Sequence, residues 1–254
     1  MAAFGTTGEG TSFSANERLL ATERLLKSGF APERIVLGVG FPAVEATIAL
    51  ARAALSIGLT HVLILPPYFY RDAPPEGIED AFSAIFDGVA DTRLRATLYH
   101  IPQVSGVAVP ALVAARLRAR YGAMVAGVKD SSADFAQFQA FRAASPDLAI
   151  LVGNEPDIGR ALSEGGAGTI CGLGNIVPEL VRTMFTDRSA GAEIREVIAL
   201  FEGRSFVPTL KAILAAQTKD PAWLNVKAPL RPGSIAEGES LLEILAALRG
   251  REAA

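Results

Sequence analysis

The sequence predicts an α/β protein that forms a (β/α) barrel, or most of one, followed by a helical region at the C-terminus. Short aliphatic runs alternate with amphipathic segments at roughly 25–35 residues per unit, which indicates right-handed βαβ connections and a parallel sheet. Half of the 254 residues are hydrophobic and only 7% are aromatic, which suits aliphatic strands covered by helices. After Asp187 the strand signals stop and only helical signals remain.

Seven segments have the composition of buried strands, because each is an aliphatic or β-branched run bounded by turn residues. They are residues 2–5, 34–40, 60–65, 94–100, 124–129, 148–152 and 168–171. Helical spacing of apolar residues predicts helices at 44–57, 75–89, 110–120, 134–144, 156–164, 178–185, 192–202, 207–217 and 235–248. We therefore expect a barrel over residues 1–187 and a helical domain over residues 188–254.

The alternative architecture is a doubly wound open sheet that binds a nucleotide. Such a sheet usually carries a glycine-rich loop after its first strand and an acidic residue about 20 positions later. The segment Gly38-Val39-Gly40 lacks the third glycine in register, and Pro42 interrupts the loop. The barrel is therefore the favoured prediction.

Composition argues against several classes of partner and cofactor. A net charge of −3 and a pI near 5.5 provide no broad basic surface for nucleic acid. Cys171 is the single cysteine and His61 and His100 are the only histidines, so neither an internal disulfide nor a zinc site of the usual Cys/His type is expected. We see no signal peptide and no apolar run of the roughly 18 residues that a membrane span needs, and we expect a soluble, cytoplasmic protein.

Lys129 is the first candidate catalytic residue. Active sites of (β/α) barrels lie at the C-terminal ends of the strands, and Lys129 is the only one of five lysines at the end of an apolar strand. An amine there is partly shielded from water, which disfavours the charged ammonium form. A neutral amine can attack a ketone and form an imine, which serves as an electron sink. An isolated lysine at such a position more often only marks where a strand meets solvent.

Tyr99 and two threonines complete the predicted set. Tyr99 ends the strand before the one that carries Lys129, so its phenol could relay the protons that imine formation requires. Thr6 and Thr7 lie in a glycine-flanked turn whose hydroxyls and backbone N–H groups suit a carboxylate. Ser14 and Glu17 downstream match a capping box and predict a helix start. His100 follows Tyr99, and the sequence leaves open whether it points toward the site or away from it.

Three motifs carry a resemblance to a known family. Gly-Thr-Thr-Gly-Glu at residues 5–9, Tyr-x-x-Pro at 99–102 and Gly-Val-Lys-Asp-Ser-Ser at 127–132 follow one another at strand ends about one βα unit apart. In this order they resemble the dihydrodipicolinate synthase and N-acetylneuraminate lyase family of class I aldolases. The resemblance implies a (β/α)8 TIM barrel with a C-terminal helical domain, usually in a homotetramer, and we expect a homo-oligomer (a tetramer or dimer).

The resemblance also implies roles for individual residues. Lys129 would form the imine, Tyr99 would relay protons, and Thr6 would orient Tyr99. Thr7 would bind the carboxylate of a 2-oxo acid, and the backbone of Ile170 would face the bound keto acid. No metal and no separate cofactor are implied. Further candidate substrate contacts in the loops are Ser105, Asn154 and Glu155.

Two departures from the family pattern narrow the prediction. Dihydrodipicolinate synthases carry an arginine two residues after the proline of Tyr-x-x-Pro, where this chain has Val104, and their paired tyrosines align with Tyr68 and Phe69. The segments around Ser105 and Lys129 look closer to sugar-acid lyases and 2-keto-3-deoxy acid aldolases. Family members also have a strand and helix ahead of the Gly-Thr-Thr-Gly-Glu turn. We expect this barrel to lack them, either because the true start lies upstream, which we favour, or because the chain is shortened.

The leading hypothesis is a Schiff-base lyase or aldolase that cleaves or dehydrates a 2-keto-3-deoxy sugar acid or a similar substrate and yields pyruvate or another 2-oxo acid. A non-catalytic or impaired relative that binds a keto acid is the alternative from another class. Dihydrodipicolinate synthase activity is disfavoured by Val104 and Phe69.

Overall fold

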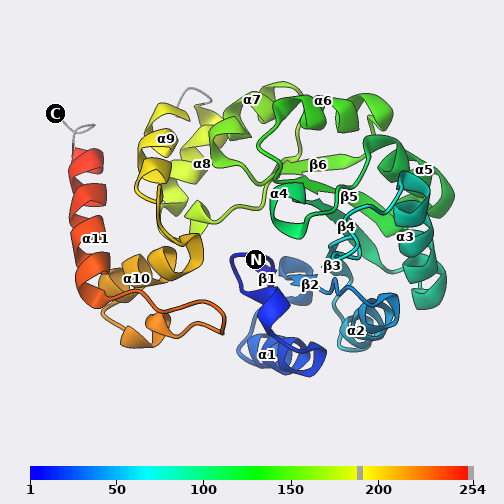
Figure 1. Cartoon of the computed structure of the whole chain (residues 1–254), viewed down its shortest axis with the longest axis horizontal. Coiled ribbons are helices and arrows are strands. Elements are labelled where there is room, and N and C mark those ends of the chain that lie inside the picture. Colours follow the sequence, from blue (N-terminus) through cyan, green and yellow to red (C-terminus); the bar gives the residue numbers. More distant parts are fainter. Residues whose placement is uncertain (188–190, 251–254) are drawn as a thin grey trace. The chain divides into compact units, whose positions relative to one another are not determined.

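The computed structural model describes residues 1–187 and 191–250 (Figure 1). By compactness the chain divides into two units, Met1–Asn154 with Glu164–Ile170 and Glu155–Ser163 with Cys171–Ala254. These units interleave along the sequence, so they do not test the predicted boundary after residue 187, which stays a prediction.

The first unit contains a single curved sheet of seven parallel strands in the order β1-β2-β3-β4-β5-β6-β7. The strands are β1 (Ala2–Ala3), β2 (Val36–Gly38), β3 (His61–Ile64), β4 (Arg95–His100), β5 (Val125–Asp130), β6 (Ala149–Val152) and β7 (Gly168–Thr169). All seven predicted strands are present; six are shorter than predicted, and β5 has the predicted length but begins and ends one residue later. Because the order never reverses, the sheet is barrel-like and not doubly wound. Within the described residues β1 and β7 are not paired with each other.

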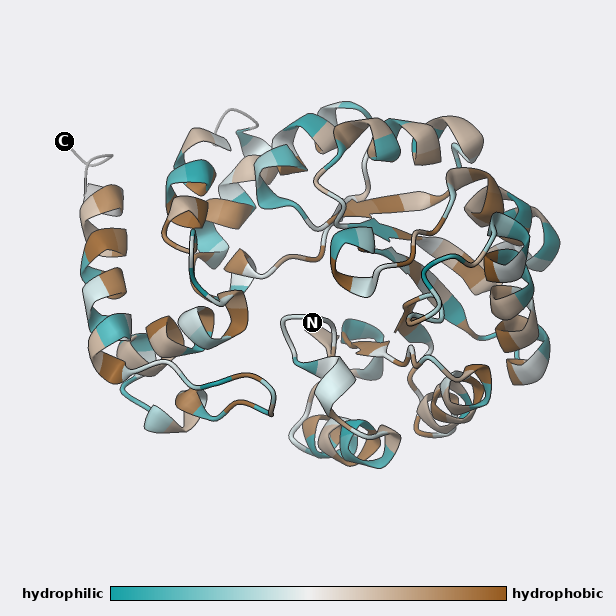
Figure 2. Cartoon of the chain, viewed as in Figure 1, coloured by the Kyte–Doolittle hydropathy of each residue, from teal (hydrophilic) through white to brown (hydrophobic). Residues whose placement is uncertain are grey.

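Helices connect successive strands of this sheet. They are α1 (Ala15–Lys27), α2 (Val44–Ser56), α3 (Pro75–Val89), α4 (Pro102–Ser105), α5 (Ala111–Tyr121) and α6 (Phe135–Ala144), with 3-10 turns η1 (Gly10–Ser12), η2 (Pro32–Arg34) and η3 (Gly122–Met124). The predicted capping box is confirmed, because Ser14 accepts a hydrogen bond from Glu17 N and Glu17 accepts one from Ser14 N. In Figure 2 these helices carry both hydrophobic and hydrophilic residues along their length, as amphipathic helices do.

The core of this unit lies between the sheet and its helices. Alternate residues of β3, β4 and β5 are fully buried, among them Ile64, Leu98 and Val128. Four phenylalanines of α3 and α6 are also almost completely buried: Phe82, Phe86, Phe138 and Phe141. Since successive residues of a strand point to opposite faces, the residues between the buried ones point to the inner side of the curved sheet.

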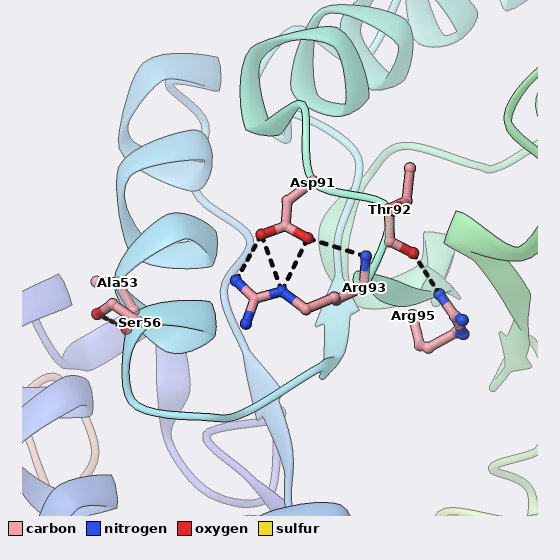
Figure 3. Close-up of polar contacts among 6 residues, drawn as sticks. All are labelled: Ala53, Ser56, Asp91, Thr92, Arg93 and Arg95. Carbon is pink, nitrogen blue, oxygen red and sulfur yellow. Dashed lines mark hydrogen bonds and ion pairs between the residues drawn. The ribbon is translucent and has the colours of Figure 1, made fainter.

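A tight turn starts β4, the strand that carries Tyr99 (Figure 3). Asp91 accepts hydrogen bonds from the guanidinium of Arg93 at 2.6–3.2 Å and from its backbone N–H at 2.9 Å. Arg95 Nη1 donates to Thr92 O at 2.8 Å, and Arg95 N donates to Thr60 O at 2.8 Å. These bonds establish where β4 begins to pair with β3.

The second unit is helical in its described part. Its helices are α7 (Ile158–Ser163), α8 (Pro178–Thr186), α9 (Gly191–Ala199), α10 (Phe206–Thr218) and α11 (Ile235–Gly250), with 3-10 turns η4 (Glu155–Asp157), η5 (Leu173–Asn175) and η6 (Pro221–Leu224). The three helices predicted after residue 187 are thus present. A Cβ on Gly238 would lie 2.0 Å from Ala212 O, so glycine is what allows α11 to approach α10 closely. No helix in the described part of the chain combines the length and the apolarity that crossing a membrane requires.

Candidate active site

Strand register places Tyr99 beside Lys129. The two are direct partners across the β4–β5 pairing, and Lys129 Nζ donates a hydrogen bond to Tyr99 Oη at 3.0 Å. Nζ also lies 4.0 Å from the centre of the Tyr99 ring. Only 7% of Lys129 and 3% of Tyr99 is exposed, so the amine lies in a largely dry environment with the phenol as its hydrogen-bond partner. The sequence-based expectation that they are neighbours is confirmed.

Thr6 extends this pair to a third polar group. Its Oγ1 lies 3.1 Å from Tyr99 Oη, and either hydroxyl can donate. The phenol therefore contacts the Lys129 amine on one side and the Thr6 hydroxyl on the other. Such a chain can pass a proton between an amine-bound reactant and the threonine, which is exposed to solvent in this chain.

A tightly folded turn holds Thr6 in place. Gly10 N donates to Gly5 O at 3.0 Å, and Phe4 has a φ of 58°, a left-handed conformation that is strained for a phenylalanine. A Cβ on Gly10 would lie 1.9 Å from Phe4 O, and one on Gly38 of β2 would lie 2.2 Å from the same oxygen. The Phe4 carbonyl thus fits between two glycines, which brings the turn against β2.

A small cavity of about 20 Å³ lies inside the sheet next to these groups, lined by Thr6, Tyr99, Leu63, Leu65 and Arg18 among others. This volume is enough for about one water molecule. The aliphatic side chains Leu63 and Leu65 pack with Tyr99 and Ile101 in one hydrophobic cluster. The phenol ring is therefore held by apolar contacts while its hydroxyl remains available to the polar chain.

Arg18 is a buried charge that the sequence analysis missed. It projects from α1, is 1% exposed, and donates to Phe13 O, Gly38 O and Gly40 O at 3.2, 3.0 and 3.4 Å. Burial lowers the pKa of its guanidinium, and the nearby Tyr68 partly opposes this shift. Burial likewise raises the pKa of the Tyr68 phenol. Through these bonds Arg18 ties α1 to the C-terminal end of β2, next to the turn that carries Thr6.

Ser131 and Gly153 are two further neighbours of the lysine that the sequence analysis missed. A Cβ built on Gly153 would lie 1.9 Å from Ser131 Oγ and 3.1 Å from Lys129 Cε. The Ser131 hydroxyl and the end of the Lys129 side chain are therefore both packed against the Gly153 backbone. Their sequence signal was weak, since a serine two residues after a strand-end lysine is ordinary turn composition.

The remaining predicted residues differ in how their polar groups are used. Thr7 is half-buried in the same turn as Thr6, and its hydroxyl makes no hydrogen bond within the described residues. Ser105 Oγ lies 3.0 Å from Ile101 O and 2.8 Å from Val107 O and donates its single proton within this pair of carbonyls, so it closes its own turn. Ile170 N donates to Val152 O at 3.2 Å, directly after β7. Asn154 is half-buried and follows Gly153 in the chain.

Glu155, which belongs to the second unit, acts as an acceptor for backbone groups. Its Oε1 accepts hydrogen bonds from Gly172 N at 2.9 Å and Leu173 N at 3.0 Å, and the residue is 7% exposed. The carboxylate thus holds the start of η5. Its predicted contact with substrate stays a prediction.

His100 points away from Tyr99, which answers the question that the sequence left open. It is 3% exposed and packs edge-on against Phe141 of α6, with ring centres 5.4 Å apart. Its Nδ1 accepts a hydrogen bond from Val109 N at 3.0 Å. Burial lowers the pKa of His100, although the charges of Asp130 and Asp134 oppose the shift. A neutral imidazole with its proton on Nε2 fits these contacts.

The residues that depart from the family pattern lie on the surface of this chain. Val104 is 60% exposed, and Phe69 and Tyr70 are 79% and 74% exposed. The Phe69 and Tyr70 rings meet edge to face with centres 5.5 Å apart. Among the described residues, no group of three or more His, Cys, Asp or Glu side chains is arranged to hold a metal ion.

Comparisons of the whole chain with known proteins point to one family. Residues 1–232 match the Dihydrodipicolinate synthetase family. An uncharacterized DapA-like lyase of Chloroflexus aurantiacus is 35% identical over 247 residues, which cover 94% of this chain and 81% of the relative. A 4-hydroxy-tetrahydrodipicolinate synthase of Clostridium perfringens is 32% identical over 176 residues, which cover 69% of this chain and 58% of that protein.

The fold has a close counterpart among solved structures. The crystal structure of dihydrodipicolinate synthase from Agrobacterium tumefaciens superposes with a TM-score of 0.91 at 31% identity, over 97% of this chain and 86% of that one. The family match covers most of the chain, and the parallel order of the strands agrees with the fold of this solved relative. The chain belongs to the dihydrodipicolinate synthetase family.

Proposed function

We propose that this protein is a class I lyase or aldolase that forms a Schiff base between Lys129 and pyruvate or a related 2-oxo acid. The observation that supports this most is the buried 3.0 Å hydrogen bond between Lys129 Nζ and Tyr99 Oη. An amine sheltered from water can act as a nucleophile, and a phenol in contact with it can move the protons that imine formation requires.

Imine formation follows from this arrangement. Lys129 Nζ attacks the C2 carbonyl carbon of the keto acid, while Tyr99 Oη donates a proton to the carbonyl oxygen and takes one from the nitrogen. A second proton through Tyr99 lets the C2 hydroxyl leave as water, and the C2–N iminium remains. Thr6, 3.1 Å from Tyr99 Oη, orients the phenol and exchanges its proton.

The iminium then allows a C–C bond to break. When the C4 hydroxyl of the substrate loses its proton through Tyr99, the C3–C4 bond breaks and its electron pair moves into the iminium, which becomes an enamine. An aldehyde leaves, the enamine is protonated at C3, and water releases the 2-oxo acid and regenerates the Lys129 amine. Dehydration proceeds through the same iminium, by loss of a C3 proton and then of the C4 hydroxyl.

The carboxylate of the keto acid is assigned to the turn at residues 5–9. Thr7 offers a hydroxyl without a partner among the described residues, and a glycine-flanked turn offers backbone N–H groups, which together suit an anion. The Ile170 backbone would face the keto acid. Ser131, packed beside Lys129 Cε, would form a hydrogen bond with a substrate hydroxyl. Candidate contacts for the sugar-acid portion of the substrate remain Ser105, Asn154 and Glu155.

A 2-keto-3-deoxy sugar acid or a similar hydroxylated keto acid is the proposed substrate. Val104 stands where dihydrodipicolinate synthases place a carboxylate-binding arginine, and an exposed valine cannot pair with a carboxylate. Phe69 likewise lacks the hydroxyl of the tyrosine to which it corresponds. The related synthases make dihydrodipicolinate synthase activity the second candidate. The resemblance further implies a homo-oligomer, and the sequence features predict a cytoplasmic location.

Reductive trapping tests the mechanism. The protein is incubated with pyruvate, reduced with borohydride, digested and mapped by mass spectrometry. We expect a reduced pyruvate adduct on the peptide containing Lys129, and none in Lys129→Met. Lys27→Met, a lysine of α1 outside the site, is the matched control and keeps the adduct. Wild-type protein without an adduct on Lys129 would contradict the Schiff-base mechanism and favour a keto-acid-binding relative.

A further inference from the structure

The segment after Tyr99 is closed by its own hydrogen bonds. Within residues 101–109, Ser105 N and Gly106 N donate to Ile101 O and Pro102 O at 2.9 and 2.8 Å, which forms the short helix α4. At the far end, Val109 N donates to the buried His100 Nδ1 at 3.0 Å. The segment is therefore anchored to the end of β4 and provides a firm base for its side chains.

One side chain of this segment reaches across to the strand that carries Lys129. Gln103 Nε2 donates a hydrogen bond to Ser131 O, while Ser131 N donates to His100 O at 2.8 Å. Both backbone polar groups of Ser131 are thus held from the β4 side, one by the main chain and one by the Gln103 amide. Gly153 N also donates to Asp130 O at 2.6 Å and fixes the preceding peptide from the β6 side.

This anchoring determines where the Ser131 hydroxyl lies. Bonds to both the N–H and the C=O of Ser131 fix the direction of its Cα–Cβ bond, and the packing of Oγ against Gly153 beside Lys129 Cε defines where the hydroxyl lies. Within the described residues the hydroxyl itself forms no hydrogen bond. Ser131 is half-buried and its hydroxyl is unused, so this hydroxyl is available for a hydrogen bond to a molecule attached to Lys129.

We infer that Gln103 is a positioning residue for specificity: by holding Ser131 O, it keeps the Ser131 hydroxyl where it binds the 4-hydroxyl of a 2-oxo acid joined to Lys129. This inference rests on the proposed Schiff-base function. Gln103 itself is exposed, and its amide bonds to Ser131 O. We therefore expect it to affect recognition of the substrate's 4-hydroxyl and not imine formation.

Equilibrium trapping of two keto acids tests this role. The probes are 4-hydroxy-2-oxobutanoate and 2-oxobutanoate, which have the same carbon chain and differ in one hydroxyl. For each, the concentration that gives half-maximal borohydride-trapped adduct on Lys129 is measured. We expect wild-type protein to need about tenfold less of the hydroxylated acid, as one added hydrogen bond allows. Gln103→Met and Gln103→Glu, which lack the donor, should bring this ratio close to one.

Two further variants separate positioning from general structure. Ser131→Ala should abolish the preference as well, and the double variant with Gln103→Met should show no additional loss, since both act through one hydroxyl. Gln139→Met is the matched control. Gln139 lies outside the site, and its Nε2 donates a comparable exposed hydrogen bond to Glu164 Oε2 over a distance of 2.8 Å. It should keep the wild-type ratio.

The outcomes are distinct. If neither acid is trapped on Lys129 in wild-type protein, the proposed function fails and this inference with it. If both are trapped but wild-type protein shows no preference, or if Gln103→Met shifts both concentrations equally and keeps the ratio, the proposed function stands and the role of Gln103 is overturned.

Discussion

The ends of β4 and β5 carry two pairs of polar residues that differ only in the face of the sheet to which they point. Tyr99 and Lys129 are cross-strand partners on the inner face, and His100 and Asp130 are partners one position later on the outer face. All four are almost completely buried. The inner pair bond to each other, whereas the outer pair bond to backbone groups: His100 to Val109 N and Asp130 to Ser132 N.

Neighbouring residues of the same two strands therefore have different roles: the inner pair is placed for chemistry and the outer pair for stability. Buried polar groups are costly unless hydrogen-bonded, so each pair needs partners. In the outer pair, His100 Nδ1 and Asp130 Oδ1 accept backbone N–H groups of the loops that follow their own strands and thereby hold those loops in place, while the buried His100 Nε2 has no partner among the described residues. The inner pair satisfy each other, which leaves a nucleophile and a proton donor in contact. We expect inner-face changes to affect rate and outer-face changes to affect stability.

The largest effect is expected for Tyr99→Phe. Removing the phenol hydroxyl should lower kcat by about 10²–10⁴-fold, the usual contribution of a positioned proton donor, and weaken keto-acid binding far less. The unfolding free energy should change by no more than about 1 kcal/mol, because the ring keeps its apolar contacts. Steady-state kinetics and urea denaturation check both expectations. Equal losses in kcat and in binding would argue against the relay.

Gly153→Ala should give a smaller loss on the inner face. Its methyl group would lie 1.9 Å from Ser131 Oγ, so the serine and the neighbouring Lys129 must shift. We expect kcat/KM to fall by about 10²-fold, as displacements near 1 Å can cause. Gly77→Ala is the control, since a Cβ there meets only Pro74 at 3.6 Å. Wild-type activity in Gly153→Ala would show that the lysine has more room than its contacts indicate.

His100→Phe tests the outer face. The substitution keeps an aromatic ring against Phe141 but leaves the buried Val109 N–H without its acceptor, which should lower the unfolding free energy by about 1–3 kcal/mol. The trapped pyruvate adduct on Lys129 should still form. Denaturation curves and adduct yields measure the two effects. If His100→Phe abolished the adduct while leaving stability intact, the division between the two faces would be wrong.

The smallest expected effect is a pH dependence of the unfolding free energy that is due to His100, and His100→Phe tests it as well. Because burial lowers the His100 pKa below the ordinary 6.5, the unfolded chain binds more protons than the folded one just below that pH. Stability from the neutral imidazole is therefore full above pH 6.5 and is lost as the pH falls, with a slope of at most about 1.4 kcal/mol per pH unit. His100→Phe should lack this contribution.

Much of the fold could be predicted from the sequence because it depends on local periodicity. Aliphatic runs with turn residues on either side located all seven strands, and Ser14 with Glu17 located the start of α1. The adjacency of Tyr99 and Lys129 followed as well, since consecutive parallel strands of a barrel are neighbours. The orientation of His100 could have been derived too, because a residue next to an inward-facing Tyr99 must point outward.

The rest depends on contacts between segments far apart in the sequence. Arg18 resembles any helical arginine until its guanidinium is seen to bond carbonyls of β2. Nothing local indicates that Gln103 reaches Ser131 or that Gly153 packs against Lys129. Nor does local composition show that Glu155 Oε1 accepts hydrogen bonds from two backbone N–H groups. Long-range packing therefore determines which polar groups remain free.

The pairing of Tyr99 with Lys129 has a consequence for how the site comes into being. A slip of one residue between β4 and β5 would bring His100 inward, and a slip of two would set Thr97 or Ile101 opposite the lysine. Among these registers, only the observed one makes Tyr99 the direct cross-strand partner of Lys129. The reactive centre therefore forms only when β4 and β5 pair in this register, and it is lost when that pairing breaks.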